Sequence, residues 1–171
     1  MAAEKPIKLD SQGRLVETAP AQTSSGAADA DRLVATGSDG YIDPTLLPPG
    51  IDDAKTVVAS EAISAGDLIN IFDDAGTPKA RKADGSTYSK RAMGYALDSI
   101  TLAASGRIRL DGIVTGLSGL TIGAKYYLSA ATPGSVTTTA PVAVGAIVQS
   151  VGEAVSATEL SFERGEPVIR V

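Results

Sequence analysis

The feature that most constrains the fold is a series of short apolar runs between Ala54 and Val171, each ended by glycine or another turn-forming residue. Runs of this length are typical of β-strands and too short for most helices. Their spacing of roughly 8 to 12 residues favours a sandwich or a barrel. We therefore predict an all-β fold, in which a β-sandwich or β-barrel-like domain over residues 54–171 follows an extended amino-terminal arm over residues 1–50.

The first runs of this domain, in residues 54–75, predict two strands joined by a turn at Ala65, Gly66 and Asp67. A helix capped by Asp52 or Asp53 is the alternative for the first of them, but its β-branched Thr-Val-Val run favours a strand. The other candidate strands are RAMGYALDSI, GRIRLDGIVTGL, KYYLSA, GSVTTT, VAVGAIVQSVG, TELSFER and PVIRV.

The first 50 residues differ in composition. A KPIKLDSQGRLVET segment has a hairpin pattern around Ser-Gln-Gly, a linker of small residues follows, and residues 33–42 repeat the pattern around Ser38, Asp39 and Gly40. Segments with so little apolar surface do not fold alone. We expect them to bind a partner through the apolar residues Ile7, Leu9, Leu15, Val16, Leu33, Val34, Tyr41, Ile42, Leu46 and Leu47.

The chain contains neither histidine nor cysteine. Without histidine, acid–base catalysis near neutral pH would need a carboxylate or a lysine whose pKa is shifted by burial. Without cysteine there are no disulfides, thiolate zinc sites or thiol nucleophiles. We therefore expect a protein that is not an enzyme and that needs no cofactor and no metal.

The formal net charge is −5, with 4 basic and 7 acidic residues in residues 1–50 and 11 basic and 13 acidic residues in the remainder. This balance offers no net positive field to a nucleic-acid backbone. No run of about 18 apolar residues could span a bilayer, and the first ten residues lack the apolar stretch of a secretory signal. We expect no nucleic-acid partner and no membrane partner.

The local excess of positive charge lies in FDDAGTPKARKADGSTYSKR, where only Asp84 interrupts the basic residues. These residues are a candidate patch for contact with an acidic protein surface, and a solvated loop is the alternative. The patch consists of Lys79, Arg81, Lys82, Lys90 and Arg91.

Other candidate sites lack the spacing that their chemistry requires. Asp73 and Asp74 do not fit the calcium-loop pattern, which makes a hairpin tip the better interpretation. The glycines of residues 112–123 match neither a dinucleotide-binding loop nor a P-loop. The serines and the lysine of residues 86–90 come with no sign of an oxyanion hole.

Four motifs carry a resemblance to a known family: SAGD at Ser64–Asp67, Gly94-Tyr95-Ala96, GAKYYLS at residues 123–129 and VGEAVSATEL at residues 151–160. In this order they resemble a β-structured module of tailed-bacteriophage virion proteins, which include capsid decoration (cement) proteins and head or tail fibres. The resemblance covers about two thirds of the chain.

This resemblance implies a structural virion protein that is assembled in the host cytoplasm and lies on the capsid surface. Its implied partners are the major capsid protein and itself, as a homotrimer at three-fold positions. The arm would add a strand to a sheet edge on the capsid, and binding to the assembled shell alone would stabilise that shell. The resemblance supplies no active-site residues.

Two other function classes remain open at this point. A head or tail fibre that recognises a host surface glycan would use exposed aromatic residues, and the neighbouring pair here is Tyr126 and Tyr127. Adjacent residues of a strand point to opposite faces, so no more than one of the two can serve a given face. A glycan-cleaving enzyme would need two well-placed carboxylates, whereas the acidic residues here lie mostly in turns.

Overall fold

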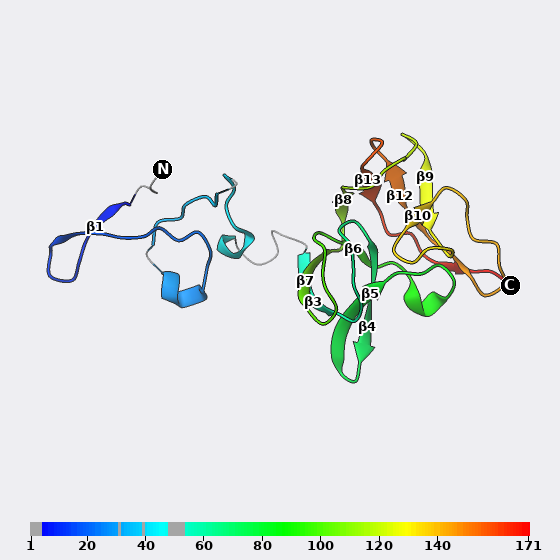
Figure 1. Cartoon of the computed structure of the whole chain (residues 1–171), viewed down its shortest axis with the longest axis horizontal. Coiled ribbons are helices and arrows are strands. Elements are labelled where there is room, and N and C mark those ends of the chain that lie inside the picture. The colour runs from blue at the N-terminus through cyan, green and yellow to red at the C-terminus, as the bar shows by residue number, and fades with distance from the viewer. Residues whose placement is uncertain (1–4, 31, 39, 48–53) are drawn as a thin grey trace. The chain divides into compact units, whose positions relative to one another are not determined.

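The computed structural model describes residues 5–30, 32–38, 40–47 and 54–171. The chain divides into two compact units, residues 1–52 and residues 53–171, which we call the amino-terminal unit and the β domain. Strands and short 3-10 helices make up the secondary structure of the described residues (Figure 1). The all-β prediction is therefore confirmed.

The amino-terminal unit begins with an antiparallel hairpin of β1 (Ile7–Leu9) and β2 (Leu15–Glu17). Two 3-10 helices follow, η1 (Gly26–Asp29) and η2 (Pro44–Leu46). Between the two helices the chain passes beside the segment that precedes η1, and there Val34 forms an isolated parallel bridge with Ala21. The first predicted hairpin is thus present.

Residues 33–42 repeat the turn of the first hairpin but not its two-stranded ladder. Val34 is bridged to Ala21 instead, and the turn is closed by a hydrogen bond from the Gly37 N–H to the Tyr41 carbonyl. Polar residues and prolines around this segment leave too few alternating positions for a second ladder. Asp39, in the predicted turn, lies outside the described residues, as do the candidate helix caps Asp52 and Asp53.

The first half of the β domain is a closed barrel with the strand order β3-β5-β4-β6-β7. The pair β3–β5 is parallel, whereas the other pairs are antiparallel. Residues 54–59 form a strand and not a helix, as the β-branched run predicts. The strands are β3 (Ala54–Ala59), β4 (Leu68–Asp74), β5 (Thr77–Lys82), β6 (Gly94–Ala96) and β7 (Ser105–Arg109).

Alanine and glycine among the larger aliphatic residues help five strands close. A barrel with so few strands has a narrow interior, which a set of large residues would overfill. Gly106 shows how tight the fit is, because a Cβ there would overlap the side chain of Ile100. The barrel core consists of Val57, Ala59, Ile63, Ile69, Ala80, Ala96, Ile100 and Ile108.

The second half is an antiparallel sheet with the order β10-β9-β12-β13-β8. KYYLSA and GSVTTT pair within it as β9 and β10, with Val136 opposite Leu128. A separate two-stranded ladder joins β11 (Ile147–Val148) to β14 (Val168–Ile169). The strands of the larger sheet are β8 (Gly112–Val114), β9 (Lys125–Leu128), β10 (Val136–Thr137), β12 (Ser150–Ala154) and β13 (Leu160–Phe162).

A larger core joins the barrel to the sheet. Leu68 and Tyr95, on barrel strands β4 and β6, belong to this core and not to the barrel interior. The ring of Tyr95 meets the ring of Phe162 from β13 edge to face, with centroids 5.7 Å apart. Its hydroxyl lies 2.9 Å from the Ile113 carbonyl oxygen in β8. The two halves therefore share buried residues, as one folding unit does.

The structure describes no helix that is both long and apolar enough to cross a membrane.

The bulge in β12 depends on Gly152. The register of β12 against β9 shifts between Ser150 and Gly152, and Gly152 has a φ of +130°. A Cβ at this position would overlap the carbonyl oxygen of Ser161 on the neighbouring strand β13. Glycine is the residue that permits both the backbone conformation and this close approach.

We predict that Gly152→Ala lowers the free energy of unfolding by about 3 kcal/mol or more, because overlap and backbone strain add together. The matched control is Gly119→Ala, where φ is +69° but no atom lies near the new methyl group; its expected cost is about 1 kcal/mol. Urea unfolding followed by circular dichroism measures both. Equal losses for the two variants would contradict this account of the bulge.

Candidate functional site

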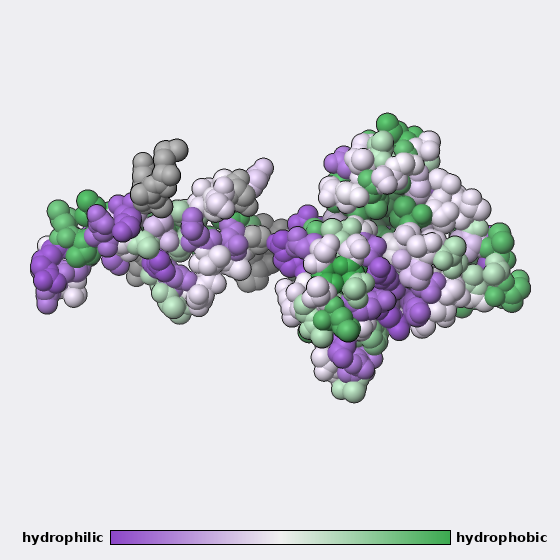
Figure 2. Space-filling model, viewed as in Figure 1, coloured by the Kyte–Doolittle hydropathy of each residue, from purple (hydrophilic) through white to green (hydrophobic). Residues whose placement is uncertain are grey.

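Most of the large apolar side chains in the amino-terminal unit are exposed. Their exposed fractions run from 37% at Leu47 to 75% at Tyr41. Val16 and Leu46 are half-buried, and the small residue Ala21 is buried. Figure 2 shows hydrophobic surface beside hydrophilic surface over this unit. The other exposed members of the predicted set are Ile7, Leu9, Leu15, Leu33, Val34 and Ile42.

The register of the hairpin collects three of these side chains on one face. Ile7 lies opposite Glu17 and Leu9 lies opposite Leu15, so Ile7, Leu9 and Leu15 share a face, which we call the hairpin face. Each of the three is more than 60% exposed. An apolar face of this kind on a two-stranded ladder gains stability when another surface covers it.

Both outer edges of the hairpin carry free main-chain groups. The Thr18 N–H donates to the Pro6 carbonyl, and the Asp10 N–H donates to the Arg14 carbonyl. In an antiparallel ladder, hydrogen-bonded and non-hydrogen-bonded pairs alternate. The N–H and C=O groups of Leu9 and Leu15, one pair further along, therefore point away from the ladder. Such edges can accept another strand.

The hairpin turn is held by the carboxylate of Asp10. Its Oδ1 accepts hydrogen bonds from the backbone N–H groups of Gln12 and Arg14, both at 2.9 Å, and its Oδ2 accepts one from Arg14 Nε at 2.9 Å. The backbone N–H of Arg14 and then its guanidinium hold the pKa of Asp10 below the ordinary value.

A second ion pair fastens the linker to the segment that follows it. Arg32 donates to Asp29 Oδ1 at 2.6 Å and to the Ala19 carbonyl at 2.9 Å. The backbone N–H of Ser25 donates to Asp29 Oδ2. That hydrogen bond, followed by the one from Arg32, lowers the pKa of Asp29. Side-chain contacts of this kind shape the unit although it has little apolar core.

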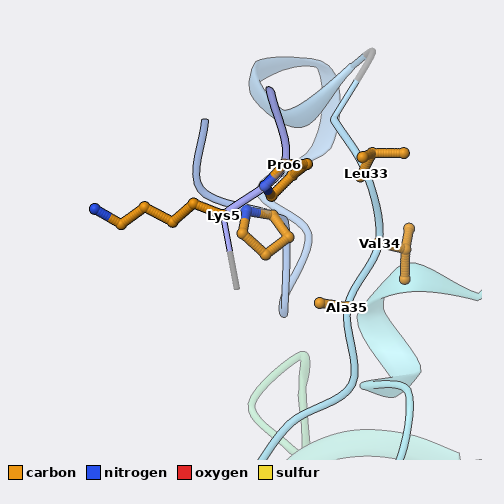
Figure 3. A pocket seen from close by; sticks show the side chains of 6 residues that line it. Lys5, Pro6, Leu33, Val34 and Ala35 are labelled. Carbon is orange, nitrogen blue, oxygen red and sulfur yellow. The ribbon is translucent and has the colours of Figure 1, made fainter. Parts of the chain in front are cut away.

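A shallow hollow of about 320 Å³ lies beside this linker. Lys5, Pro6 and Pro20 line it together with residues 33–35, and Figure 3 shows Leu33, Val34 and Ala35 along one segment, across from Lys5 and Pro6. The hollow therefore adjoins two exposed apolar residues of the predicted set. We call the hairpin face, this hollow and the exposed residues Tyr41, Ile42 and Leu47 the docking surface.

The five basic residues of the predicted patch are mostly engaged within the β domain. The three lysines form ion pairs, Lys79 with Asp74, Lys82 with Asp67 at 3.2 Å and Lys90 with Asp84 at 3.7 Å. Arg81 lies over the ring of Phe72 and donates to Asn70 Oδ1 and the Ser89 carbonyl, both at 2.9 Å. Arg91 lies over the ring of Tyr88.

Asp73 and Asp74 lie at the exposed tip of the β4–β5 hairpin, as predicted. Asp73 accepts a hydrogen bond from the Gly76 N–H, and both central turn residues, Ala75 and Gly76, have positive φ. This geometry is that of a tight hairpin turn. Within the described part of the chain, no group of three or more acidic side chains could hold a metal ion.

The adjacent tyrosines do not form an exposed aromatic platform. Tyr126 is 5% exposed, and its hydroxyl oxygen accepts a hydrogen bond from the Thr121 N–H at 2.9 Å. Tyr127 is half-buried. The alternation along β9 directs Tyr126 into the larger core, where it packs as a structural residue.

Sequence reasoning missed an exposed apolar area at the carboxy-terminal edge of the β domain. Hydrogen bonds join its two segments, from Gly145 N–H to the Arg170 carbonyl and from Arg170 N–H to the Ala146 carbonyl. A hollow of about 350 Å³ lies along β14. The sequence predicts strands in this region, but it does not show which of them no other element packs against. This carboxy-terminal patch consists of Val142, Val144, Val168, Ile169 and Val171.

Comparisons of the chain with protein families, with curated proteins and with solved structures gave no match.

We predict that the hairpin turn loosens in acid. Because the folded pKa of Asp10 is depressed, its contribution to stability is complete above the pKa of an unfolded aspartate and is lost as the pH falls through the folded value. Carbonyl-carbon NMR should show Asp10 titrating below the ordinary aspartate range. Arg14→Gln should bring this pKa part of the way back, since the backbone hydrogen bonds remain. An unshifted pKa in the parent protein would contradict the turn geometry.

Proposed function

We propose that this chain is a structural virion protein of a tailed bacteriophage, a capsid decoration protein whose amino-terminal unit binds the major capsid protein. The docking surface carries the proposal, because it exposes apolar side chains that the unit itself cannot bury. The motif resemblance described above supplies the class of partner. Under this proposal the protein acts on the capsid surface, after assembly in the host cytoplasm.

The free energy for binding would come from burial of the hairpin face. Fully covering a leucine or isoleucine side chain contributes roughly 1.5–3 kcal/mol, and part of that is offset by ordering of the unit. A strand of the partner that pairs with an edge of the hairpin would add main-chain hydrogen bonds and fix the register. Each bound copy then stabilises the assembled shell, because it binds only that state.

The combined variant Ile7→Ser, Leu9→Ser, Leu15→Ser should bind expanded capsids about 100-fold more weakly, since three apolar anchors are lost at about 1 kcal/mol each. Co-sedimentation with capsids of the phage that encodes the chain measures this. The matched control, Lys8→Ser, changes the opposite face of the same hairpin and should bind normally. Deletion of residues 1–50 should abolish binding, and a deletion variant that still co-sediments would contradict the proposal.

Self-association is the second part of the proposal, as a homotrimer of β domains. The carboxy-terminal patch supports it, because exposed apolar residues that gather at one edge of a domain are typical of a protein contact. Among the described residues, its strand β14 pairs on one side only, with β11. Contact between copies at this edge would bury the valines, and it would give hydrogen-bond partners to the main-chain groups on the unpaired side of β14.

Val144→Asp combined with Val171→Asp should convert the oligomer to monomer, because two carboxylates would have to be buried at the contact. Sedimentation equilibrium of the purified protein gives the mass of each species. Ile122→Asp is the matched control, since Ile122 is 69% exposed but lies outside the patch. A parent protein that is monomeric at high concentration would contradict self-association.

A further inference from the structure

A small polar hollow of about 220 Å³ lies on the β domain, and none of the residues that line it belongs to the docking surface. Tyr88, Arg91, Gln149 and residues 164–167 line it. Two of these residues, Arg91 and Arg164, are cations from segments far apart in the sequence. Convergence of like charges on one hollow costs electrostatic energy that an anionic ligand would offset.

Neither arginine forms an ion pair within the part of the chain that the structure describes. Among the residues that the structure describes, the ion pairs of the β domain involve Lys79, Lys82, Lys90 and Arg107, but not Arg91 or Arg164. Arg91 instead lies with its guanidinium carbon 5.0 Å from the centre of the Tyr88 ring. That contact restricts the side chain while its donors remain available.

A buried glutamine holds together the two segments that carry the arginines. Gln149 is fully buried. Its Oε1 accepts from the Ala92 N–H at 2.8 Å, and its Nε2 donates to the Ala92 carbonyl at 2.9 Å and to the Gly165 carbonyl at 3.2 Å. Ala92 follows Arg91 and Gly165 follows Arg164, so one amide fixes the backbone beside both cations. Such a frame is preorganised for a ligand.

A second buried amide supports the same loop. Asn70 is 1% exposed, and its Nδ2 donates to the Arg91 carbonyl at 2.8 Å. Its Oδ1 accepts from Arg81 Nε, whose guanidinium also donates to the Ser89 carbonyl. Arg81, predicted from sequence as part of a contact patch, therefore positions the loop of residues 84–92, and Arg91 is the patch member that faces the hollow.

The remaining lining residues narrow the class of ligand. The carboxylate of Glu166 lies at the same hollow and forms no ion pair within the described part of the chain. It would repel a doubly charged phosphate more strongly than a singly charged carboxylate, and it accepts hydrogen bonds from hydroxyl groups. The Tyr88 ring, 41% exposed, offers a face for an apolar ring surface. A ligand that has one carboxylate and several hydroxyl groups would offer a partner to the arginines, to Glu166 and to the Tyr88 ring.

We propose that this hollow binds an acidic sugar, a uronic or sialic acid residue of a surface polysaccharide. Arg91 and Arg164 bind the carboxylate, as guanidinium groups do in paired hydrogen bonds, and Glu166 binds sugar hydroxyl groups. Gln149 acts as a positioning residue for both arginines. The site uses none of the residues of the docking surface, so each can be altered by substitutions that leave the residues of the other unchanged.

The test is a titration of the full-length protein with D-glucuronic acid and with N-acetylneuraminic acid, followed by amide NMR. We expect at least one of them to shift the amide signals of Ala92 and Gly165, and D-glucose, which lacks the carboxylate, to leave them unchanged. Arg164→Gln should weaken binding by at least about tenfold. The matched control Arg107→Gln removes a guanidinium that pairs with Asp98 and should bind normally.

Glu166→Gln separates a sugar site from a general anion site. This variant should bind the acidic sugar more weakly and inorganic phosphate more tightly than the parent protein does. The proposal is overturned if neither acidic sugar shifts those amides at millimolar concentration, if phosphate binds the parent as tightly as the sugar, or if Arg164→Gln binds unchanged. Both changed side chains are exposed, so the spectra of the free variants should show an intact fold.

Discussion

The β domain depends on strands whose consecutive residues serve two different cores. In β4, Leu68 packs into the core that joins barrel and sheet, while the next residue, Ile69, fills the barrel. In β6, Tyr95 and Ala96 divide in the same way. Because side chains alternate along a strand, a wall of the barrel can be apolar on both faces. This arrangement explains how a chain with few aromatic residues builds a continuous interior. Aliphatic residues fill the barrel, and the buried aromatic residues, with Phe162 against Tyr95, lie in the core outside it.

The amino-terminal unit shows the opposite balance between polar contacts and apolar burial. Hydrogen bonds to two carboxylates, Asp10 in the hairpin and Asp29 beside η1, hold its turns. Its large apolar side chains, in contrast, are mostly exposed to solvent. Local polar contacts set the shape of the chain, and they leave the apolar surface available for a partner. The two units thus differ in what stabilises them. One is stabilised by its own core, and under our proposal the other gains its burial by binding, which is the behaviour expected of a protein that fills space between larger molecules.

Short glycine-punctuated runs were enough to predict the all-β class, the strand at residues 54–59 and strands at KYYLSA and GSVTTT. They did not reveal β5, because TPKARK is polar and contains proline; tertiary contacts make it a strand, with Ala80 inward and Pro78 near its start, before the pairing with β3 begins. Closure of the barrel depends on pairs such as β3 with β7, which no local pattern encodes. The hollow at Arg91 and Arg164 was equally hidden, since it requires Gln149 to join segments distant in sequence.

The central claim is that the chain works by occupying surface on other molecules, with the docking surface as its point of attachment. The most direct measurement is an electron cryomicroscopy reconstruction of the phage particle on which we propose that the protein lies. The account predicts density for residues 5–47 against the capsid subunits, with Ile7, Leu9 and Leu15 covered and the β domain outside the shell. A reconstruction in which those three side chains face solvent, or in which the protein is absent from the capsid, would contradict it.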